Sequence, residues 1–390
     1  MALKANEQSC TKVWIFNVLL GLCLVIALLF HGFFNKGYSF ILTSSPPSEG
    51  GDSSTKKGQL SVVEGPGPLL EARGKVVKPQ VNVKAPWVPD NTTTLCPLVP
   101  PQLVGALEPF QDAPSFEEVV KLNPGLEPGG HFHPPDCRAR SRVAVVIPYR
   151  DREQHLRILL HNLHPMLMRQ QLDYAIIVVE LAQPTEFNRA MLLNIGAVEA
   201  LGLWDFQCFI FHDVDLVPEN DRNLYTCPKM PRHLSVFVDI FGYHLPHQMI
   251  FGGVTALKRE QFYAINGYPN KYFGWGGEDD DMASRITESN LTITRDELDV
   301  AKYRMLQHDR DWGNDPNPNR YKLINTWKSR HDKDGLNSLQ YTIQTVEFRP
   351  AYTWINVTID KDTILKVRTA LVRVLCVAPS FFDVCSGGSS

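Results

Sequence analysis

The segment "VAVVIPYR" (Val143–Arg150) decides the fold, because it is a continuous apolar run that ends in a charged residue. Such a run is typical of a β-strand that is buried on both faces of a sheet. The residues that follow, 153–171, carry leucines three and four positions apart, which is the spacing of one helix face. The pattern predicts a strand followed by a helix that packs on the sheet.

The same alternation continues downstream. A second apolar run, "YAIIVVE" (Tyr174–Glu180), precedes the helical pattern "FNRAMLLNIGAVEAL" (Phe187–Leu201), and a third strand is expected at "QCFIFHDVDL" (Gln207–Leu216). Strands that alternate with helices predict an α/β fold with a parallel sheet. In such sheets, ligands bind beyond the carboxyl ends of the strands.

Charged side chains follow two of these strands. Arg150 and Arg152 come after the first strand, and Asp213 and Asp215 end the third. On an extended backbone the two aspartates project to the same side. A divalent metal prefers oxygen ligands and arginine suits phosphate, so the combination predicts a nucleotide-sugar site. A solvated strand end is the alternative for the two aspartates.

Four adjacent acids lie in "FGWGGEDDDM" (Phe273–Met282). Acids favour the N-terminal end of a helix, so a helix start is one interpretation. In a transferase, one carboxylate would take the proton of an acceptor hydroxyl while Trp275 stacks on a sugar ring. Because neighbouring helical residues point about 100° apart, we expect only one or two of the four acids to face a cleft.

The segment "RMLQHDRD" places Met305 and His308 three residues apart, so they can share one face of a turn. A thioether is a soft donor and Mn²⁺ is a hard ion, which makes this an unusual metal pair. The residues alone leave open a core methionine beside a surface histidine.

The N-terminal part differs from the rest of the chain. Residues 13–34 are apolar and long enough to span a bilayer, which takes about 20 residues. Lys4 and Lys12 precede them and favour a cytosolic N-terminus. A cleaved signal peptide is the alternative, although its apolar core would be shorter. We expect a cytoplasmic tail at 1–12, a transmembrane signal-anchor at 13–34, a flexible stem at 35–94, a catalytic domain at 95–362 and an extension without an assigned role at 363–390.

Other features agree with a luminal domain. Asn91, Asn290 and Asn356 begin N-glycosylation sequences. Six cysteines follow the apolar segment, an even number that predicts disulfides in an oxidising compartment, with 15 pairings open. The net charge of −3 gives no reason to expect nucleic acid as a partner.

Several stretches together resemble one family. They are "VVIPYRDREQHL", "FNRAMLLNIG", "FHDVDLVPEND", "FGGVTALKREQFYAINGYPNKYFGWGGEDDD", "RMLQHDRD" and "DGLNSLQY", in order between about Cys96 and Asp360. They closely resemble the β-1,4-galactosyltransferases, Golgi type II membrane enzymes with a GT-A-like, Rossmann-like fold. The resemblance implies a catalytic domain that inverts the anomeric carbon in one displacement.

The resemblance also implies roles for single residues. Mn²⁺ would be held by Asp215, Met305 and His308, and Asp279 would be the general base. Donor-binding residues would be Pro148, Arg150, Arg152, Phe187, Arg189, Asp213, Val214 and Trp275. Acceptor-binding residues would be Gly277, Glu278, Asp280, Arg320, Tyr321 and Ile324. Disulfides would join Cys96 to Cys137 and Cys208 to Cys227. Cys376 and Cys385 lie beyond the matched region, and their pairing is left open.

Two positions depart from the family pattern. Ile250 stands where galactose-transferring members usually have tyrosine, and an aliphatic residue there is typical of the invertebrate N-acetylgalactosaminyl-transferring branch. Removal of a phenol makes room for an N-acetyl group at the donor. An ordinary core substitution is the alternative. His247 stands where an acceptor-side tyrosine is common, and therefore bears on acceptor choice.

The sequence is therefore interpreted as a Golgi, Mn²⁺-dependent enzyme that moves N-acetylgalactosamine from UDP-GalNAc in β-1,4 linkage to terminal GlcNAc of a glycolipid or glycoprotein. The first alternative is the same enzyme with UDP-galactose. The second is a non-catalytic, lectin-like or Ca²⁺-binding membrane ectodomain. The acceptor carrier, the oligomeric state and any accessory membrane protein are left open.

Overall fold

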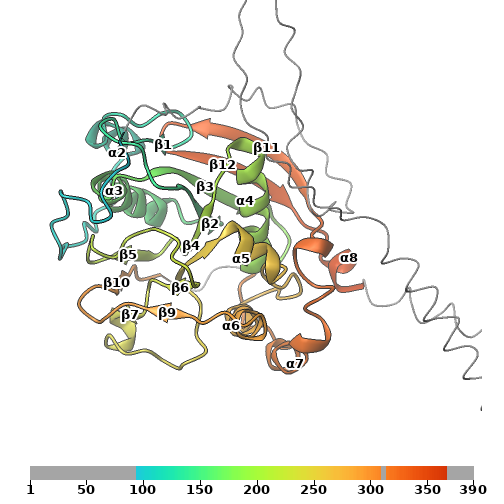
Figure 1. Cartoon of the computed structure of the whole chain (residues 1–390). Coiled ribbons are helices and arrows are strands. Elements are labelled where there is room, and N and C mark those ends of the chain that lie inside the picture. Colours follow the sequence, from blue (N-terminus) through green and yellow to red (C-terminus); the bar gives the residue numbers. More distant parts are fainter. Residues whose placement is uncertain (1–93, 309–312, 367–390) are drawn as a thin grey trace, which may run out of the picture. The chain divides into compact units, whose positions relative to one another are not determined.

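A mixed β-sheet with helices on both faces forms the centre of the structure, a computed structural model that describes residues 94–308 and 313–366 (Figure 1). The predicted cytoplasmic tail, signal-anchor and most of the stem lie outside the described residues, as do Asn91, Cys376 and Cys385. Within the described ranges, no helix has both the length and the apolar character to cross a bilayer.

The three predicted strands form the parallel centre of the sheet. They are β2 (Arg142–Tyr149), β3 (Asp173–Leu181) and β4 (Cys208–His212). The strands β3 and β4 pair with opposite edges of β2, both in parallel. The chain therefore runs from β2 to β3 on one side and then crosses to β4 on the other side of β2. A crevice opens between the carboxyl ends of β2 and β4, where the two connections leave in opposite directions.

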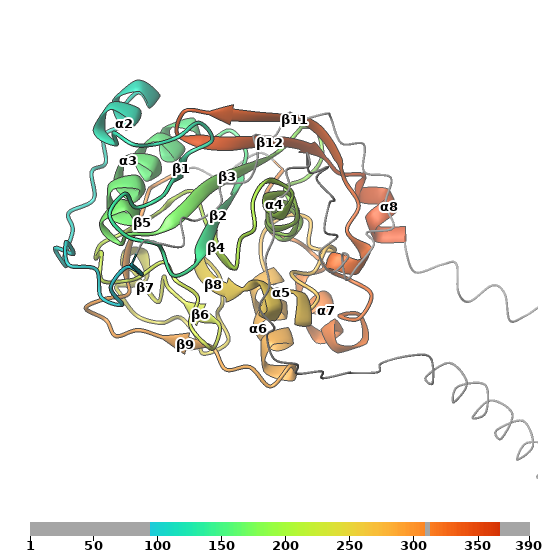
Figure 2. The ribbon, with the colours of Figure 1, turned by 45° about the horizontal axis from the view of Figure 1, so that its top comes forward.

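The two predicted helices cover opposite faces of this sheet (Figure 2). The alternation of β2 shows how: Ala144 and Val146 belong to the core under α4 (Arg189–Leu203), whereas Val145 and Ile147 belong to the core under α3 (Glu153–Arg169). Successive side chains of a strand point to opposite faces, so a continuous apolar run fills both layers.

Further strands extend the sheet in the order β11-β12-β3-β2-β4-β8-β6-β9, and β1 also pairs with β3. The last two strands within the described residues form an antiparallel hairpin whose second strand lies parallel to β3. The bounds are β1 (His131–Phe132), β6 (Arg232–His233), β8 (Val254–Lys258), β9 (Thr294–Arg295), β11 (Thr342–Arg349) and β12 (Tyr352–Thr358).

A small second sheet lies beyond the carboxyl end of β4. It has the order β5-β10-β7, with β5 (Leu216–Pro218), β10 (Lys302–Met305) and β7 (Phe237–Val238). The remaining helices are α2 (Phe116–Leu122), α5 (Arg259–Ala264), α6 (Glu278–Glu288), α7 (Arg320–Asn325) and α8 (Lys361–Lys366), with short 3-10 turns between them.

Two boundaries differ from the sequence prediction. The strand β4 ends at His212, so Asp213 and Asp215 lie in the turn before β5 rather than on an extended strand, and they do not share a strand face. The expected domain limit at residue 362 falls inside α8, and Ile364 of that helix is buried in the core under α4.

Both disulfides that the family resemblance implies are present, Cys96–Cys137 and Cys208–Cys227. The second bridge joins the start of β4 to the loop before β6. It therefore fixes one side of the chain segment that leads into the crevice.

Candidate active site

A cleft of about 780 Å³ opens at the carboxyl ends of β2 and β4. It is lined by all the residues that the sequence assigned to the metal, base, donor and acceptor roles, and by Ile250 and His247. These residues are Pro148, Arg150, Arg152, Phe187, Arg189, Asp213, Val214, Asp215, Trp275, Gly277, Glu278, Asp279, Asp280, Met305, His308, Arg320, Tyr321 and Ile324. Segments more than 170 residues apart thus meet in one site.

A buried cation and an aromatic ring mark one end of the cleft. Arg150, directly after β2, is only 5% exposed. Its Nη1 donates to the carbonyl oxygen of Thr185 at 2.6 Å, and its guanidinium lies 5.1 Å from the centre of the Phe187 ring. A fixed guanidinium beside a ring is suited to a phosphate attached to a planar base.

Arg189, the first residue of α4, connects two acidic segments. Its Nε donates to Oδ1 of Asp213 at 2.6 Å, and its Nη1 lies 3.6 Å from Oε1 of Glu278. Burial, followed by the nearby charge of Asp279, raises the pKa of Glu278 to about 7. One arginine therefore ties the turn after β4 to the start of α6.

The three residues expected to hold a metal lie together. Pairing of β10 with β5 places Met305 beside Leu216, and the backbone N–H of Leu306 donates to the carbonyl oxygen of Asp215 at 2.7 Å. Nε2 of His308 then lies 3.1 Å from Oδ2 of Asp215. Octahedral coordination at about 2.1 Å separates adjacent ligand atoms by about 3 Å, so this donor set fits a hard divalent ion with one soft ligand.

The four adjacent acids have different surroundings. Glu278, Asp279 and Asp280 line the cleft, so the expectation that only one or two would do so is wrong. The first three residues of α6 therefore all contribute to the cleft wall. Asp281 is fully buried instead, where it accepts hydrogen bonds from Tyr272, Arg285 and Arg330.

The Asp279 side chain packs against the backbone at Gly252. A Cβ atom added at Gly252 would lie 2.9 Å from its Oδ2. The next residue, Asp280, faces a histidine: its Oδ1 lies 3.8 Å from Nε2 of His247. Burial and the charge of Asp279 raise the pKa of Asp280, whereas His247 lowers it. The cleft therefore holds one closely packed carboxylate and one that faces a histidine.

Exposed aromatic side chains and an arginine form another part of the cleft wall. Trp275 is 60% exposed, and the guanidinium of Arg320 lies 5.8 Å from its ring and 4.7 Å from the ring of Tyr321. Gly277 is the N-cap of α6 with φ of 97°, and a Cβ there would lie 3.1 Å from Ile324. Exposed rings around a cleft provide flat surfaces for sugar rings.

Ile250 is half-buried and its backbone is fixed. Its carbonyl oxygen accepts a hydrogen bond from Nη2 of Arg295 at 2.9 Å, and its N–H donates to the carbonyl oxygen of His247. The side chain lines the cleft along with Gly252 and Gly253. Position 250 is therefore a wall of the site and not a core position.

The sequence interpretation missed a further stretch of the cleft wall, residues 233–246. Ile240 and Phe241 are 53% and 46% exposed, although both are large and apolar. The signal was present in "VDIFGY", where two apolar residues stand between Asp239 and Gly242 in a turn. The lining residues from this stretch are His233, Ser235, Val236, Val238, Ile240, Phe241 and Pro246.

The two described glycosylation sequences differ in accessibility. Asn290 is exposed in the turn after α6, whereas Asn356 is half-buried on β12. Only the first offers an open amide for modification.

Two family profiles match the chain. The N-terminal region of glycosyl transferase group 7 matches residues 96–228, and the N-terminal domain of galactosyltransferase matches residues 232–309. Human β-1,4-galactosyltransferase 1 is 45% identical over 317 residues, which are 81% of this chain and 76% of that protein. Cricetulus griseus β-1,4-galactosyltransferase 3 is 46% identical over 287 residues, covering 73% and 72%. A crystal structure of a Drosophila β-1,4-galactosyltransferase 7 mutant in complex with manganese, UDP-Gal and xylobiose is 28% identical, covers 56% of this chain and 94% of its own, and has a TM-score of 0.49.

Proposed function

Because the chain belongs to the β-1,4-galactosyltransferase family of glycosyl transferase group 7, we propose that it is a Mn²⁺-dependent enzyme that transfers a hexose from a UDP-sugar to terminal GlcNAc of a glycan. One observation supports this most: the metal donors, the arginines and the Asp279 carboxylate all line the same cleft. A transferase needs these three groups within reach of one anomeric carbon.

Each group has a separate task in this proposal. Arg150 and Arg152 bind the diphosphate, and Phe187 contacts the uracil. Asp215, Met305 and His308 hold Mn²⁺, which when bound offsets charge on the departing diphosphate. Asp279 accepts the proton of the acceptor hydroxyl as that oxygen bonds to the anomeric carbon and the bond to UDP breaks. The displacement occurs in one step, so the configuration inverts and no glycosyl-enzyme forms.

Acceptor binding is assigned to the exposed end of the cleft. Trp275 and Tyr321 provide faces for sugar rings, Arg320 lies between them, and Asp280 accepts hydroxyl hydrogen bonds. A lectin-like or Ca²⁺-binding ectodomain would not need the arginines or the soft donor Met305 in the same cleft. The arrangement therefore supports catalysis over binding alone.

The donor is proposed to be UDP-galactose, because the relatives at 45–46% identity are galactosyltransferases by name. UDP-GalNAc is the second candidate, and one observation favours it: Ile250 lines the cleft where a tyrosine is usual in the family. An aliphatic wall leaves volume for an N-acetyl group and apolar contact for its methyl.

The test compares transfer of galactose and N-acetylgalactosamine to a β-N-acetylglucosaminide with Mn²⁺, for the natural chain, Ile250→Tyr and Ile250→Leu. If position 250 sets the donor, Ile250→Tyr lowers kcat/KM for UDP-GalNAc relative to UDP-galactose by at least tenfold and Ile250→Leu does not. Equal ratios in all three proteins would mean that Ile250 only packs. No transfer from either donor by folded protein would refute the transferase assignment.

We also propose that the domain faces the Golgi lumen, behind a single type II anchor at residues 13–34. The exposed Asn290 gives a direct test. Expression in a glycosylating cell should yield a mass shift that an endoglycosidase removes and that Asn290→Gln reduces by one glycan, because Asn91 and Asn356 also begin glycosylation sequences. Full-length protein that carries no N-glycan would contradict a luminal domain.

A further inference from the structure

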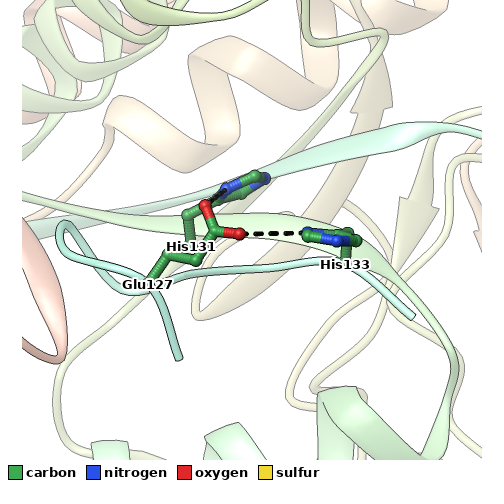
Figure 3. A group of neighbouring side chains, drawn as sticks. All are labelled: Glu127, His131 and His133. Atoms are coloured by element: carbon green, nitrogen blue, oxygen red, sulfur yellow. Dashed lines mark hydrogen bonds and ion pairs between the residues drawn. The ribbon is translucent and has the colours of Figure 1, made fainter. Parts of the chain in front are cut away.

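A cluster of metal-binding side chains lies outside the cleft, at the strand β1 that pairs with β3. It consists of Glu127, His131 and His133 (Figure 3). One potential ligand atom from each residue lies within 4.8 Å of the others. None of the three lines the cleft, so the proposed transferase chemistry leaves them without a role.

The local backbone brings these residues together. Gly129 and Gly130 adopt φ of 94° and 67°, and a Cβ at Gly130 would lie 2.3 Å from the carbonyl oxygen of Ala351. The tight turn lets the N–H of Glu127 donate to the carbonyl oxygen of His131 at 2.8 Å. His131 and His133 are two residues apart on an extended segment, so their rings share one side of it. The turn therefore returns the Glu127 carboxylate to both rings.

The buried side of the cluster fixes the tautomer of His131. Its Nε2 lies 3.1 Å from Oδ1 of Asp173, whose Oδ2 accepts a hydrogen bond from Nε of Arg142 at 3.0 Å. Asp173 is 3% exposed and paired with a cation, so it is an anion that accepts a hydrogen bond from the Nε2–H of His131. A carboxylate behind a histidine is the usual outer support of a metal-binding imidazole.

The other ring nitrogen then meets a second carboxylate. Nδ1 of His131 lies 3.2 Å from Oε2 of Glu127, and Nδ1 of His133 lies 3.3 Å from Oε1 of Glu127. With a hydrogen already on Nε2, a neutral ring presents its Nδ1 lone pair to an anion, which is unfavourable. Something positive must lie between them, either a proton on His131 or a metal ion.

We propose that Glu127, His131 and His133 bind Zn²⁺, with water as the fourth ligand. Imidazole and carboxylate are zinc donors, and bonds of about 2.0–2.1 Å place tetrahedral ligand atoms about 3.4 Å apart. The two Glu127 oxygens lie 3.2 Å and 3.3 Å from the histidine Nδ1 atoms, one oxygen to each ring. One ligand atom from each residue lies within 4.8 Å of the others, so small side-chain movements bring the set to tetrahedral spacing. The Glu127 and His133 side chains are 49% and 34% exposed and can adjust to the ion, whereas His131 is held by Asp173 and by stacking on Trp204 at 5.3 Å.

We expect a bound Zn²⁺ to hold the turn before β1 in place against the sheet. The ion ties Glu127, before the turn, to His131 of β1 and to His133 and, through Asp173, to the start of β3. Because Zn²⁺ binds the folded cluster, it stabilises the folded chain. We expect Zn²⁺ at a hundredfold excess over its Kd to raise the Tm by several degrees.

The experiment counts zinc bound by the full chain in detergent, with Mn²⁺ and UDP present to occupy the cleft. A chromophoric chelator measures Zn²⁺ after dialysis, and Co²⁺ absorption reports tetrahedral coordination. The variants are Glu127→Gln at an exposed position and His133→Ala at a half-buried one, and the control is His244→Ala, at an exposed histidine elsewhere. Circular dichroism and the disulfide content establish that each variant is folded.

The proposal requires that one zinc per chain is lost in Glu127→Gln and in His133→Ala but kept in His244→Ala, and that the Tm rise with Zn²⁺ disappears with it. Equal zinc content in all four proteins would refute the site. A natural chain that binds no zinc at the cluster would show that a proton on His131 bridges the two carboxylates instead. Neither result depends on whether the chain transfers sugar.

Discussion

Nη2 of Arg152 lies 2.7 Å from Nδ1 of His308, whose other nitrogen, Nε2, lies 3.1 Å from Oδ2 of Asp215. A guanidinium only donates, so Nδ1 is the acceptor here and Nε2 carries the hydrogen that Asp215 accepts. A metal at Nε2 requires the opposite tautomer, with the hydrogen on Nδ1. Metal binding and the Arg152–His308 hydrogen bond therefore exclude each other.

This competition predicts opposite effects of Arg152→Ala on two ligands. UDP binding in the presence of Mn²⁺ should weaken by about tenfold or more, because a charge-assisted phosphate contact is lost. Mn²⁺ binding without nucleotide should be unchanged or tighter, because the arginine no longer holds the unfavourable tautomer. Calorimetric titration of each ligand measures both, and weaker Mn²⁺ binding in the variant would contradict the competition.

Of the four adjacent acids, Asp279 is expected to affect catalysis and not the stability of the fold. Asp279→Asn should lower kcat by about 10²–10⁴-fold if its carboxylate is the general base, with little change in Tm or in UDP binding. Single-turnover rates with saturating donor measure the chemical step. An Asp279→Asn enzyme with normal kcat would remove Asp279 from the mechanism.

Asp281→Asn should instead lower the stability of the fold. Its carboxylate is fully buried between Arg285 and Arg330, with contacts of 2.7 and 2.8 Å. Loss of that charge leaves two buried guanidinium groups without their shared anion, which costs about 3–5 kcal/mol. Denaturant unfolding should show this loss, and a variant as stable as the natural chain would mean that the arginines find other partners.

Gly252→Ala should reduce activity without unfolding the protein. The added methyl lies 2.9 Å from Oδ2 of Asp279, and this flexible carboxylate can turn away at small cost. Displacement of a reacting group by about 1 Å can cost about 10²-fold in rate. We expect kcat to fall by about 10–100-fold with an unchanged Tm, and unaltered kcat would show that Asp279 tolerates the contact.

The raised pKa of Glu278 predicts a pH-dependent stability. A carboxyl that titrates near 7 in the folded chain, above its ordinary value of 4.5, stabilises the fold at low pH, and this contribution is lost as the pH rises from about 4.5 to 7. Glu278→Gln removes the titration. The Tm of Glu278→Gln relative to the natural chain should therefore increase from pH 5 to pH 7.5, and a constant difference would contradict the shift.

The centre of the fold was predictable because its strands are buried on both faces. A run such as Val143–Ile147 has no other stable environment, and the charged residues after it mark the crevice. The hairpin β11–β12 was not predicted: β11 is only partly buried, and β12, although it alternates between buried and half-buried positions, lies after a long segment without a clear strand–helix alternation. The sequence shows periodicity but not which edge a late strand joins.

The sequence predicted which residues line the cleft but not how their side chains are arranged in it. The resemblance named the residues that line the cleft, but the turn at Asp213–Asp215 and the burial of Asp281 depend on partners far along the chain, such as Arg189 and Arg330. The group of Glu127, His131 and His133 gave no signal by spacing alone, because its support comes from Asp173. Such long-range partners appear only when the chain is folded.

The position of β12 also affects how the protein is made. Thr353 pairs with Ile177, so the strand that completes this side of the parallel sheet is among the last described residues to leave the ribosome. Until then, most of one edge of β3 presents unpaired backbone groups that can pair with another chain. Since folding units form in the order of synthesis, a nascent chain stopped before residue 352 keeps this edge open. We therefore expect the half-made domain to depend on chaperones, whereas the finished one does not.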